Sequence, residues 1–151
     1  MASAVTGVYE THIPVTDLQR SVAFYEQIPG IELAQDYQSD QRAFLWVGGK
    51  SQAMIGLWQA DSGPLRMTLH FALRAGPDFI RASPGLLRDL DIPPLGFNGE
   101  PVSEPVVIGW MPAMSLYFQD PDGHSIEFIS VMDEPADAGF GVGPLSKWED
   151  R

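Results

Sequence analysis

The sequence predicts an α+β fold in which two similar halves build one curved sheet. The first observation is size: 151 residues, 44% of them apolar, are enough for one domain with a real interior. The second is a series of short segments in which apolar and polar residues alternate, as they do in strands. The third is that the two halves of the chain repeat one order of predicted strands and helix. We therefore treat residues 1–151 as a single domain with a first module (5–59), a second module (65–131) and a tail (132–151).

The first module begins with a strand that carries a histidine, in the string VYETHIPV. A helix is expected from Asp17 to Gln27, because Asp17 can cap its start and apolar residues then recur at helical spacing. Two strands follow, AFLWVGG and AMIGLWQ, joined by a Gly-Lys-Ser turn. Asp61–Pro64 is the predicted joint between the modules, since Gly and Pro interrupt regular structure there.

The second module repeats this order, beginning with the strand RMTLHFALR. A helix is expected from about Asp78 to Leu90, although Pro84-Gly85 interrupts the pattern and leaves two short turns as the alternative. The strands MSLYFQ and HSIEFISV follow, and the turn Asp120-Pro121-Asp122-Gly123 joins them into a hairpin.

Two segments are less regular. Residues 91–112 contain five prolines and predict a long loop with one edge strand at Val106–Ile108. Loops of this length often form a lid or a pocket wall. The tail ends in an apolar patch around Trp148, and either a loose or a packed tail agrees with its composition.

Four side chains are candidates for chemistry because each lies on the polar or small-residue side of its strand: His12, His70, Tyr117 and Glu127. The economical arrangement is a curved sheet with helices on its convex face and these four side chains pointing into its concave face, the cup. Two imidazoles and one carboxylate can hold a divalent metal and leave positions open for substrate.

Composition excludes several classes of function. The net charge is −11 with nine Lys and Arg, so there is no basic patch for nucleic acid. No apolar run approaches the roughly 20 residues that span a bilayer, and the N-terminal residues lack a signal-peptide pattern. The absence of cysteine excludes disulfides, thiolate ligands and thiol nucleophiles. We expect a cytoplasmic protein that acts on a small molecule, without a nucleic-acid or membrane partner.

Several features in the same order resemble the vicinal oxygen chelate superfamily: the repeated module, a histidine on the first and fifth strands, and a glutamate in the string DPDGHSIEFI. Glyoxalase I, fosfomycin-resistance thiol transferases, extradiol dioxygenases and bleomycin-resistance proteins belong to it. The resemblance covers about residues 5–131 and implies paired βαβββ modules. It also implies metal ligands at His12, His70 and Glu127, with Tyr117 as a catalytic group that orients substrate or moves a proton. A homodimer is expected, with the ligands meeting within one chain or across the interface.

The sequence departs from three of these relatives in one respect each. Glyoxalase I has a further ligand on the fourth strand, where alignment of AMIGLWQ with HSIEFIS puts Gly56 opposite Glu127. The thiol transferases carry an Arg shortly after the last-strand Glu, but residues 128–139 contain neither Arg nor Lys. Extradiol enzymes use further histidines, and the other histidine here, His124, is expected to be solvated in a turn.

The leading hypothesis is a glyoxalase-like lyase, isomerase or transferase that depends on a divalent metal, Zn, Mn, Ni or Fe(II). The metal would chelate a small oxygenated substrate and act as a Lewis acid. One alternative is an Fe(II) dioxygenase. The other is a metal-independent protein that binds a drug or metabolite, as bleomycin-resistance proteins do.

Overall fold

The computed structural model describes residues 8–60 and 68–151. The described residues divide into two compact units: residues 8–60 with 120–122, and residues 68–119 with 123–151. The predicted joint Asp61–Pro64 and the first residues of both predicted modules lie outside the described residues. Each unit carries a helix and an open sheet in the order βαβββ, so the predicted α+β fold is confirmed.

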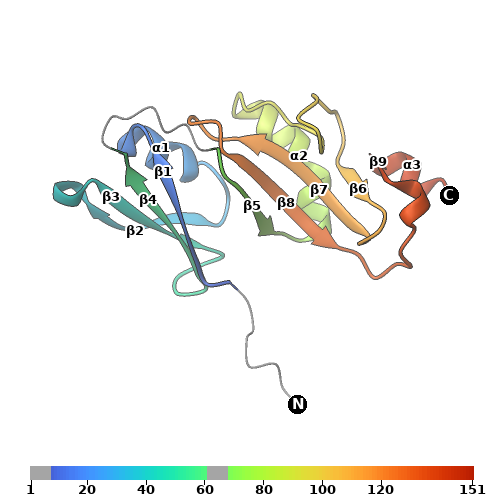
Figure 1. The fold of residues 1–151 in the computed structure, drawn as a ribbon, viewed down its shortest axis with the longest axis horizontal. Coiled ribbons are helices and arrows are strands. Elements are labelled where there is room, and N and C mark those ends of the chain that lie inside the picture. Colours follow the sequence, from blue (N-terminus) through green and yellow to red (C-terminus); the bar gives the residue numbers. More distant parts are fainter. Residues whose placement is uncertain (1–7, 61–67) are drawn as a thin grey trace, which may run out of the picture. The chain divides into compact units, whose positions relative to one another are not determined.

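The first unit has a four-stranded sheet in the order β1-β4-β3-β2, in which β1 and β4 are parallel (Figure 1). Its elements are β1 (Glu10–Val15), α1 (Leu18–Tyr25), β2 (Ile31–Tyr37), a 3-10 turn (Gln38–Asp40), β3 (Arg42–Val47) and β4 (Ala53–Gln59). The sequence pattern did not reveal β2, because Ile31 is its one buried residue and a bulge between Leu33 and Gln35 breaks the alternation.

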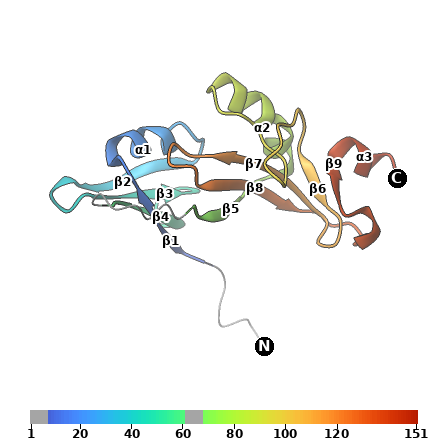
Figure 2. The ribbon, with the colours of Figure 1, turned by 45° about the horizontal axis from the view of Figure 1, so that its top comes forward.

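Helix α1 begins where the sequence predicts. The Asp17 carboxylate accepts the backbone N–H of Arg20 at 3.0 Å, which satisfies one of the free donors at the helix start. The helix ends at Tyr25, two residues earlier than expected, and buries Leu18, Val22 and Tyr25. Figure 2 shows α1 on one side of its sheet, which leaves the other side for functional side chains.

The second unit has a five-stranded sheet in the order β5-β8-β7-β6-β9, in which β5 and β8 are parallel (Figure 1). Its elements are β5 (His70–Arg74), α2 (Pro77–Asp89), β6 (Val106–Ile108), β7 (Ala113–Gln119), β8 (Ser125–Val131), a 3-10 turn (Ala138–Phe140), β9 (Val142–Pro144) and α3 (Leu145–Glu149). Its first four strands repeat the order of the first unit.

Helix α2 is one continuous helix, so the suggested break at Pro84-Gly85 is wrong. A proline inside a helix loses one backbone hydrogen bond. Here Pro84 is buried on the same face as Ile80 and Leu87, and that packing outweighs the loss. In Figure 2 this helix lies on one side of the five-stranded sheet.

The tail is packed. Strand β9 pairs with β6, so Val106–Ile108 is an inner strand and the predicted edge strand is wrong. Helix α3 buries Leu145 and Trp148, and the Trp148 indole N–H donates to Glu134 at 2.7 Å. The described helices include none that is both long enough and apolar enough to cross a bilayer.

Candidate functional site

Three of the four predicted side chains share one face of the second unit's sheet. Tyr117 on β7 lies directly opposite Glu127 on β8, and His70 on β5 lies opposite Ser125. Residues opposite each other in a sheet point to the same face, and so do residues two apart on a strand. His70, Tyr117 and Glu127 therefore lie together, as the alternation predicted, on the face away from the buried Phe118.

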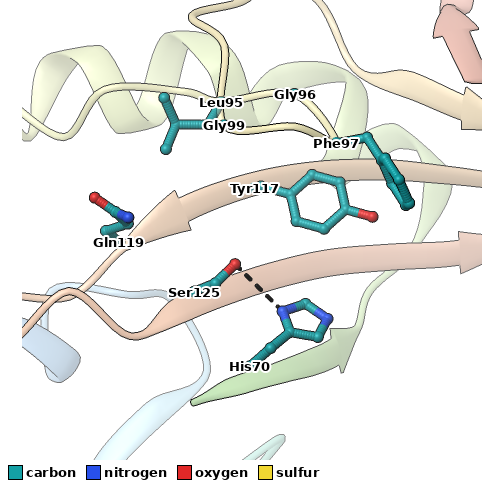
Figure 3. Close-up of a pocket in the computed structure, with 8 residues that line it drawn as sticks. All are labelled: His70, Leu95, Gly96, Phe97, Gly99, Tyr117, Gln119 and Ser125. Atoms are coloured by element: carbon teal, nitrogen blue, oxygen red, sulfur yellow. Dashed lines mark hydrogen bonds between the residues drawn. The ribbon is translucent and has the colours of Figure 1, made fainter. Parts of the chain in front are cut away.

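His70 and Glu127 are close enough to act as a pair. The Nε2 atom of His70 lies 3.3 Å from Glu127 Oε2; the histidine side chain is half-exposed, whereas the carboxylate is 6% exposed. On the other side of the ring, Nδ1 lies 3.2 Å from the Ser125 hydroxyl (Figure 3). When Nδ1–H donates to Ser125, the Nε2 lone pair faces a carboxylate oxygen, an arrangement that needs a cation between them.

One oxygen of the Glu127 carboxylate is free to bind a proton or a metal ion, as far as the described residues show. Its Oε1 atom is buried and has no hydrogen-bond partner among the described residues. An unsatisfied buried carboxylate oxygen is costly, so such an atom usually serves a proton or a metal ion. An imidazole nitrogen beside a carboxylate is a donor set that suits first-row divalent ions. These residues therefore fit the metal that the resemblance implies.

The surroundings of Tyr117 keep its hydroxyl protonated. Burial, followed by the negative charge of Glu127 and a hydrogen bond to that carboxylate, raises the pKa of the Tyr117 hydroxyl above its usual value. The hydroxyl therefore stays protonated at neutral pH. Its ring lies 6.0 Å from the ring of His70, so it can orient a molecule bound beside the histidine.

A pocket of about 300 Å³ opens over this face (Figure 3). The sheet contributes His70, Ser125, Tyr117 and Gln119, and residues 95–99 form the opposite wall. Part of the irregular 91–112 segment is thus a pocket wall. Sequence reasoning missed Ser125, although it lies two residues before Glu127 on the same strand face. It also missed Phe97, whose irregular segment offers no periodic pattern.

His12 lies in the first unit, where both of its ring nitrogens are engaged. Nδ1 accepts the indole N–H of Trp58 at 2.5 Å, and Nε2 lies 3.1 Å from Glu10 Oε1. Because an indole only donates, Nδ1 must present its lone pair, and the ring proton is on Nε2 facing Glu10. Glu10 thus orients the imidazole of His12.

The strand register corrects one alignment. Gly56 pairs with His12 in the first unit as Ser125 pairs with His70 in the second, so Trp58, and not Gly56, corresponds to Glu127. A Cβ on residue 56 would lie 2.8 Å from His12 Nδ1, so only glycine lets the imidazole lie against β4. The fourth strand still offers no carboxylate at this position.

The candidate ligands thus fall into two groups. His70 and Glu127 come together in the second unit, and His12 belongs to the first. Among the described residues, neither unit by itself gathers three His, Asp or Glu side chains that could hold a metal. His124 is 2% exposed and accepts the backbone N–H of Leu69 at 3.0 Å, so its predicted solvation is wrong. The buried ring satisfies a backbone N–H just before β5.

Comparison with known families shows which family the chain belongs to. The model of the Glyoxalase/Bleomycin resistance protein/Dioxygenase superfamily matches residues 7–128. The chain belongs to this superfamily. The resemblance seen in the sequence is therefore confirmed, and the superfamily includes enzymes of several kinds.

Several solved structures share the fold of this chain. An integron cassette protein, HFX_CASS4, from the mobile metagenome of the Halifax Harbour sewage outfall is 30% identical, with a TM-score of 0.72 over 83% of this chain and 99% of that one. Lactoylglutathione lyase from Agrobacterium tumefaciens is 21% identical, with a TM-score of 0.61 over 84% and 95% of the two chains. A mutant of the fosfomycin resistance protein FosX from Listeria monocytogenes, complexed with Mn(II) and 1S,2S-dihydroxypropylphosphonic acid, is 20% identical, with a TM-score of 0.63 over 86% and 94%. A search of curated protein sequences gives no significant match.

Proposed function

We propose that this protein is a divalent-metal-dependent enzyme of the glyoxalase-like class, a lyase, isomerase or transferase acting on a small oxygenated substrate. The observation that carries the proposal is the buried Glu127 carboxylate, which has an unpartnered oxygen and lies beside His70 Nε2. His70 and Glu127 hold the metal, and His12 is the third ligand, supplied by the same chain or by a second copy in a homodimer. The FosX structure, which contains Mn(II), supports a metal in this fold.

The metal, when bound, supplies Lewis-acid polarisation of substrate oxygens. The chain's own residues then hold the ligand groups in place and orient the substrate. When Nδ1–H of His70 donates to Ser125, this hydrogen bond fixes the ring and leaves Nε2 available as a ligand. The protonated Tyr117 hydroxyl donates a hydrogen bond to a substrate oxygen after turning away from the Glu127 carboxylate, to which it donates in the free protein. Lewis-acid chemistry by Zn, Mn or Ni and oxygen chemistry by Fe(II) make use of the same ligands. Oxygen uptake with Fe(II)-loaded protein and catechol distinguishes a dioxygenase.

A second candidate is a protein that binds a drug or metabolite without a metal. One observation favours it: Trp58 and Glu10 engage both nitrogens of His12. A histidine that binds metal through Nε2 carries its proton on Nδ1, where the indole N–H of Trp58 also points. His12 therefore joins a metal only when the Trp58 hydrogen bond breaks.

Calorimetric titration with Mn²⁺ and Zn²⁺ separates the two candidates. Protein freed of metal with a chelator should bind about one ion, and Glu127→Gln and His70→Ala should each weaken that binding by at least about 100-fold, because each removes a ligand. Glu32→Gln, which changes an exposed carboxylate of β2, is the matched control and should bind as the unmodified protein does. Equal affinity in Glu127→Gln and Glu32→Gln contradicts the metal proposal and leaves the binding protein.

The proposal includes a cytoplasmic homodimer without nucleic-acid or membrane partners. Light scattering of the full chain should give twice the mass of 16.6 kDa. A monomeric mass contradicts the dimer and requires His12 to come from the same chain.

A further inference from the structure

A second cavity lies in the first unit, apart from the pocket over Tyr117. Its volume is about 380 Å³, which is within the range of small-molecule sites. It is lined by Leu18 and by four of the chain's eight glutamines: Gln19, Gln38, Gln41 and Gln59. These glutamines come from α1, the 3-10 turn, the residue after that turn, and β4. We call this cavity the glutamine pocket.

Helix α1 covers one side of the four-stranded sheet (Figure 2), and the glutamine pocket lies on that side. Asp36 and Leu57 both pair with Ala43, and Ala43 and Leu57 are buried. Because side chains alternate along a strand, Gln59 points to the same side as Leu57. His12 pairs with the residue before Leu57 and points to the opposite side. The glutamine pocket is therefore separate from the side that carries His12.

A carboxylate fixes two side chains of the glutamine pocket. Asp36 is partly buried, and its Oδ2 atom lies 3.2 Å from Nε2 of Gln19 and 3.2 Å from Nε2 of Gln38. A carboxylate oxygen only accepts hydrogen bonds, so both carboxamides must turn their NH₂ groups toward Asp36. The carbonyl oxygens of Gln19 and Gln38 are therefore turned away from it, and both residues are exposed. Two hydrogen-bond acceptors are thus held at the surface of the pocket.

The described residues supply no cation to the Asp36 carboxylate. Its Oδ1 atom is buried and has no hydrogen-bond partner among them. None of the ion pairs in the described part of the chain includes Asp36. A buried carboxylate oxygen without a partner is costly, so a bound cation would stabilise this site. The net charge of −11 also attracts cations to the protein.

The walls of the glutamine pocket are joined to one another before any ligand binds. The backbone N–H of Gln41 donates to the carbonyl of Gln38 at 3.2 Å, and the carbonyl of Gln41 accepts the N–H of Gln59 at 2.8 Å. Gln41 has a φ of 54°, which is uncommon for a residue other than glycine. Gln59 Oε1 accepts the backbone N–H of Leu18 at 2.9 Å, which leaves the NH₂ group of Gln59 as a donor. A preformed site has a lower entropic cost of binding.

We propose that the glutamine pocket binds a small molecule that carries a primary ammonium group beside a hydroxyl or carbonyl oxygen. An ammonium group has three N–H donors and no acceptor, which suits the carbonyl oxygens of Gln19 and Gln38 close to the Asp36 carboxylate. Gln59 donates to the neighbouring oxygen of the ligand. This site goes beyond the proposed function, because it includes none of the proposed metal ligands.

Ethanolamine and choline test whether the site recognises N–H groups. Both are cations with the same hydroxyethyl group, but the nitrogen of choline is fully methylated. Calorimetry with metal-free full chain should show ethanolamine binding at least about tenfold tighter than choline, because choline makes no charge-assisted N–H hydrogen bonds. Ethanolamine should also shift the side-chain NH₂ signals of Gln19, Gln38 and Gln59 in ¹H–¹⁵N NMR spectra. Absence of ethanolamine binding, equal affinity for choline, or equal shifts with K⁺ at the same concentration contradicts the proposal.

The variant Asp36→Asn removes the charge of the site and keeps the size of the side chain. It should weaken ethanolamine binding by at least about tenfold, because the ammonium loses its anionic partner. Glu32→Gln is the matched control, since it changes an exposed carboxylate of the same strand and lowers the net negative charge equally. This control should bind ethanolamine as the unmodified protein does. Equal affinity in the two variants overturns the role of Asp36.

A second variant tests the site even if Asp36→Asn does not fold. Gln38→Met keeps the length of an exposed side chain but removes its carbonyl oxygen. With folding checked by circular dichroism, it should weaken ethanolamine binding by about threefold or more. Unchanged affinity in folded Gln38→Met contradicts the proposed contact. His70→Ala should bind ethanolamine as the unmodified protein does, and an equal loss in this variant would place the amine at the proposed metal site instead.

Discussion

At the scale of single residues, Gly56 decides how the ring of His12 lies. The variant Gly56→Ala adds a Cβ that would lie 2.8 Å from His12 Nδ1, so the imidazole must move and release the Trp58 indole. We expect a loss of about 1–3 kcal/mol in the free energy of unfolding, as for other overpacked sites. The Trp58 indole N–H signal should also shift in ¹H–¹⁵N NMR spectra.

Gly85→Ala is the matched control for this change. Gly85 lies inside α2 with open space around its Cβ position, and glycine is a poor helix former. We expect this variant to raise the free energy of unfolding by about 0.5–1 kcal/mol and leave the Trp58 signal in place. An unshifted Trp58 signal in Gly56→Ala would contradict the account of His12.

Alternation along the strands predicted which residues share a face, and that was enough to bring His70, Tyr117 and Glu127 together. It did not predict what lies opposite them, because register depends on how strands pair. For this reason Gly56 was aligned with Glu127, although the register assigns Trp58 to that position. The buried His124 was missed because its partner is a backbone N–H of Leu69, distant in sequence.

At the scale of elements, the turn Asp120–Asp122 joins β7 to β8 and is itself held in place by hydrogen bonds. It belongs to the first unit, where Asp122 accepts the backbone N–H of Thr16 at 3.0 Å, the Thr16 hydroxyl, and the Arg20 guanidinium at 3.1 Å. Burial acts to raise the pKa of Asp122, but the hydrogen bonds from Thr16 and the charge of Arg20 outweigh it. The pKa of the carboxyl is therefore held below its ordinary value of 3.8.

This lowered pKa predicts a pH dependence of stability. The unfolded chain binds a proton at Asp122 more readily than the folded chain does. The contribution of the carboxylate to the free energy of unfolding is therefore complete above pH 3.8, and it is lost as the pH falls through the lower pKa of the folded state. Denaturant unfolding should show Asp122→Asn less stable than the unmodified protein at pH 7, with a smaller difference at pH 3. Asp133→Asn, at an exposed carboxyl, should show little difference at either pH. A difference for Asp122→Asn that grows as the pH falls would contradict the assigned sign.

Elements with strong local patterns were predicted and those that depend on distant packing were not. The capping Asp17 and the alternation of β7 and β8 are local signals, and both gave the observed elements. Helix α2 continues through Pro84 because its buried face packs on the sheet, which a local rule does not include. Strand β9 has only three residues and forms by pairing with β6, so composition alone left the tail undecided.

At the scale of the whole molecule, the internal repeat was the strongest signal and gave the fold and the superfamily. The two units share a strand order, yet their corresponding sites differ: Glu127 in the second unit stands where Trp58 stands in the first. One scaffold in this superfamily supports several chemistries, so the reaction has to be decided at the site. The central claim is that the His70–Glu127 pair binds a divalent metal.

The most direct test of that claim is a crystal structure of the full chain grown with Mn²⁺, with diffraction recorded to give anomalous differences. We predict an anomalous peak at roughly 2.0–2.3 Å from both His70 Nε2 and a carboxylate oxygen of Glu127, with Nδ1 of His70 still at Ser125. A structure at saturating Mn²⁺ that has no peak within coordinating reach of Glu127, or has one held only by other residues, would contradict the claim.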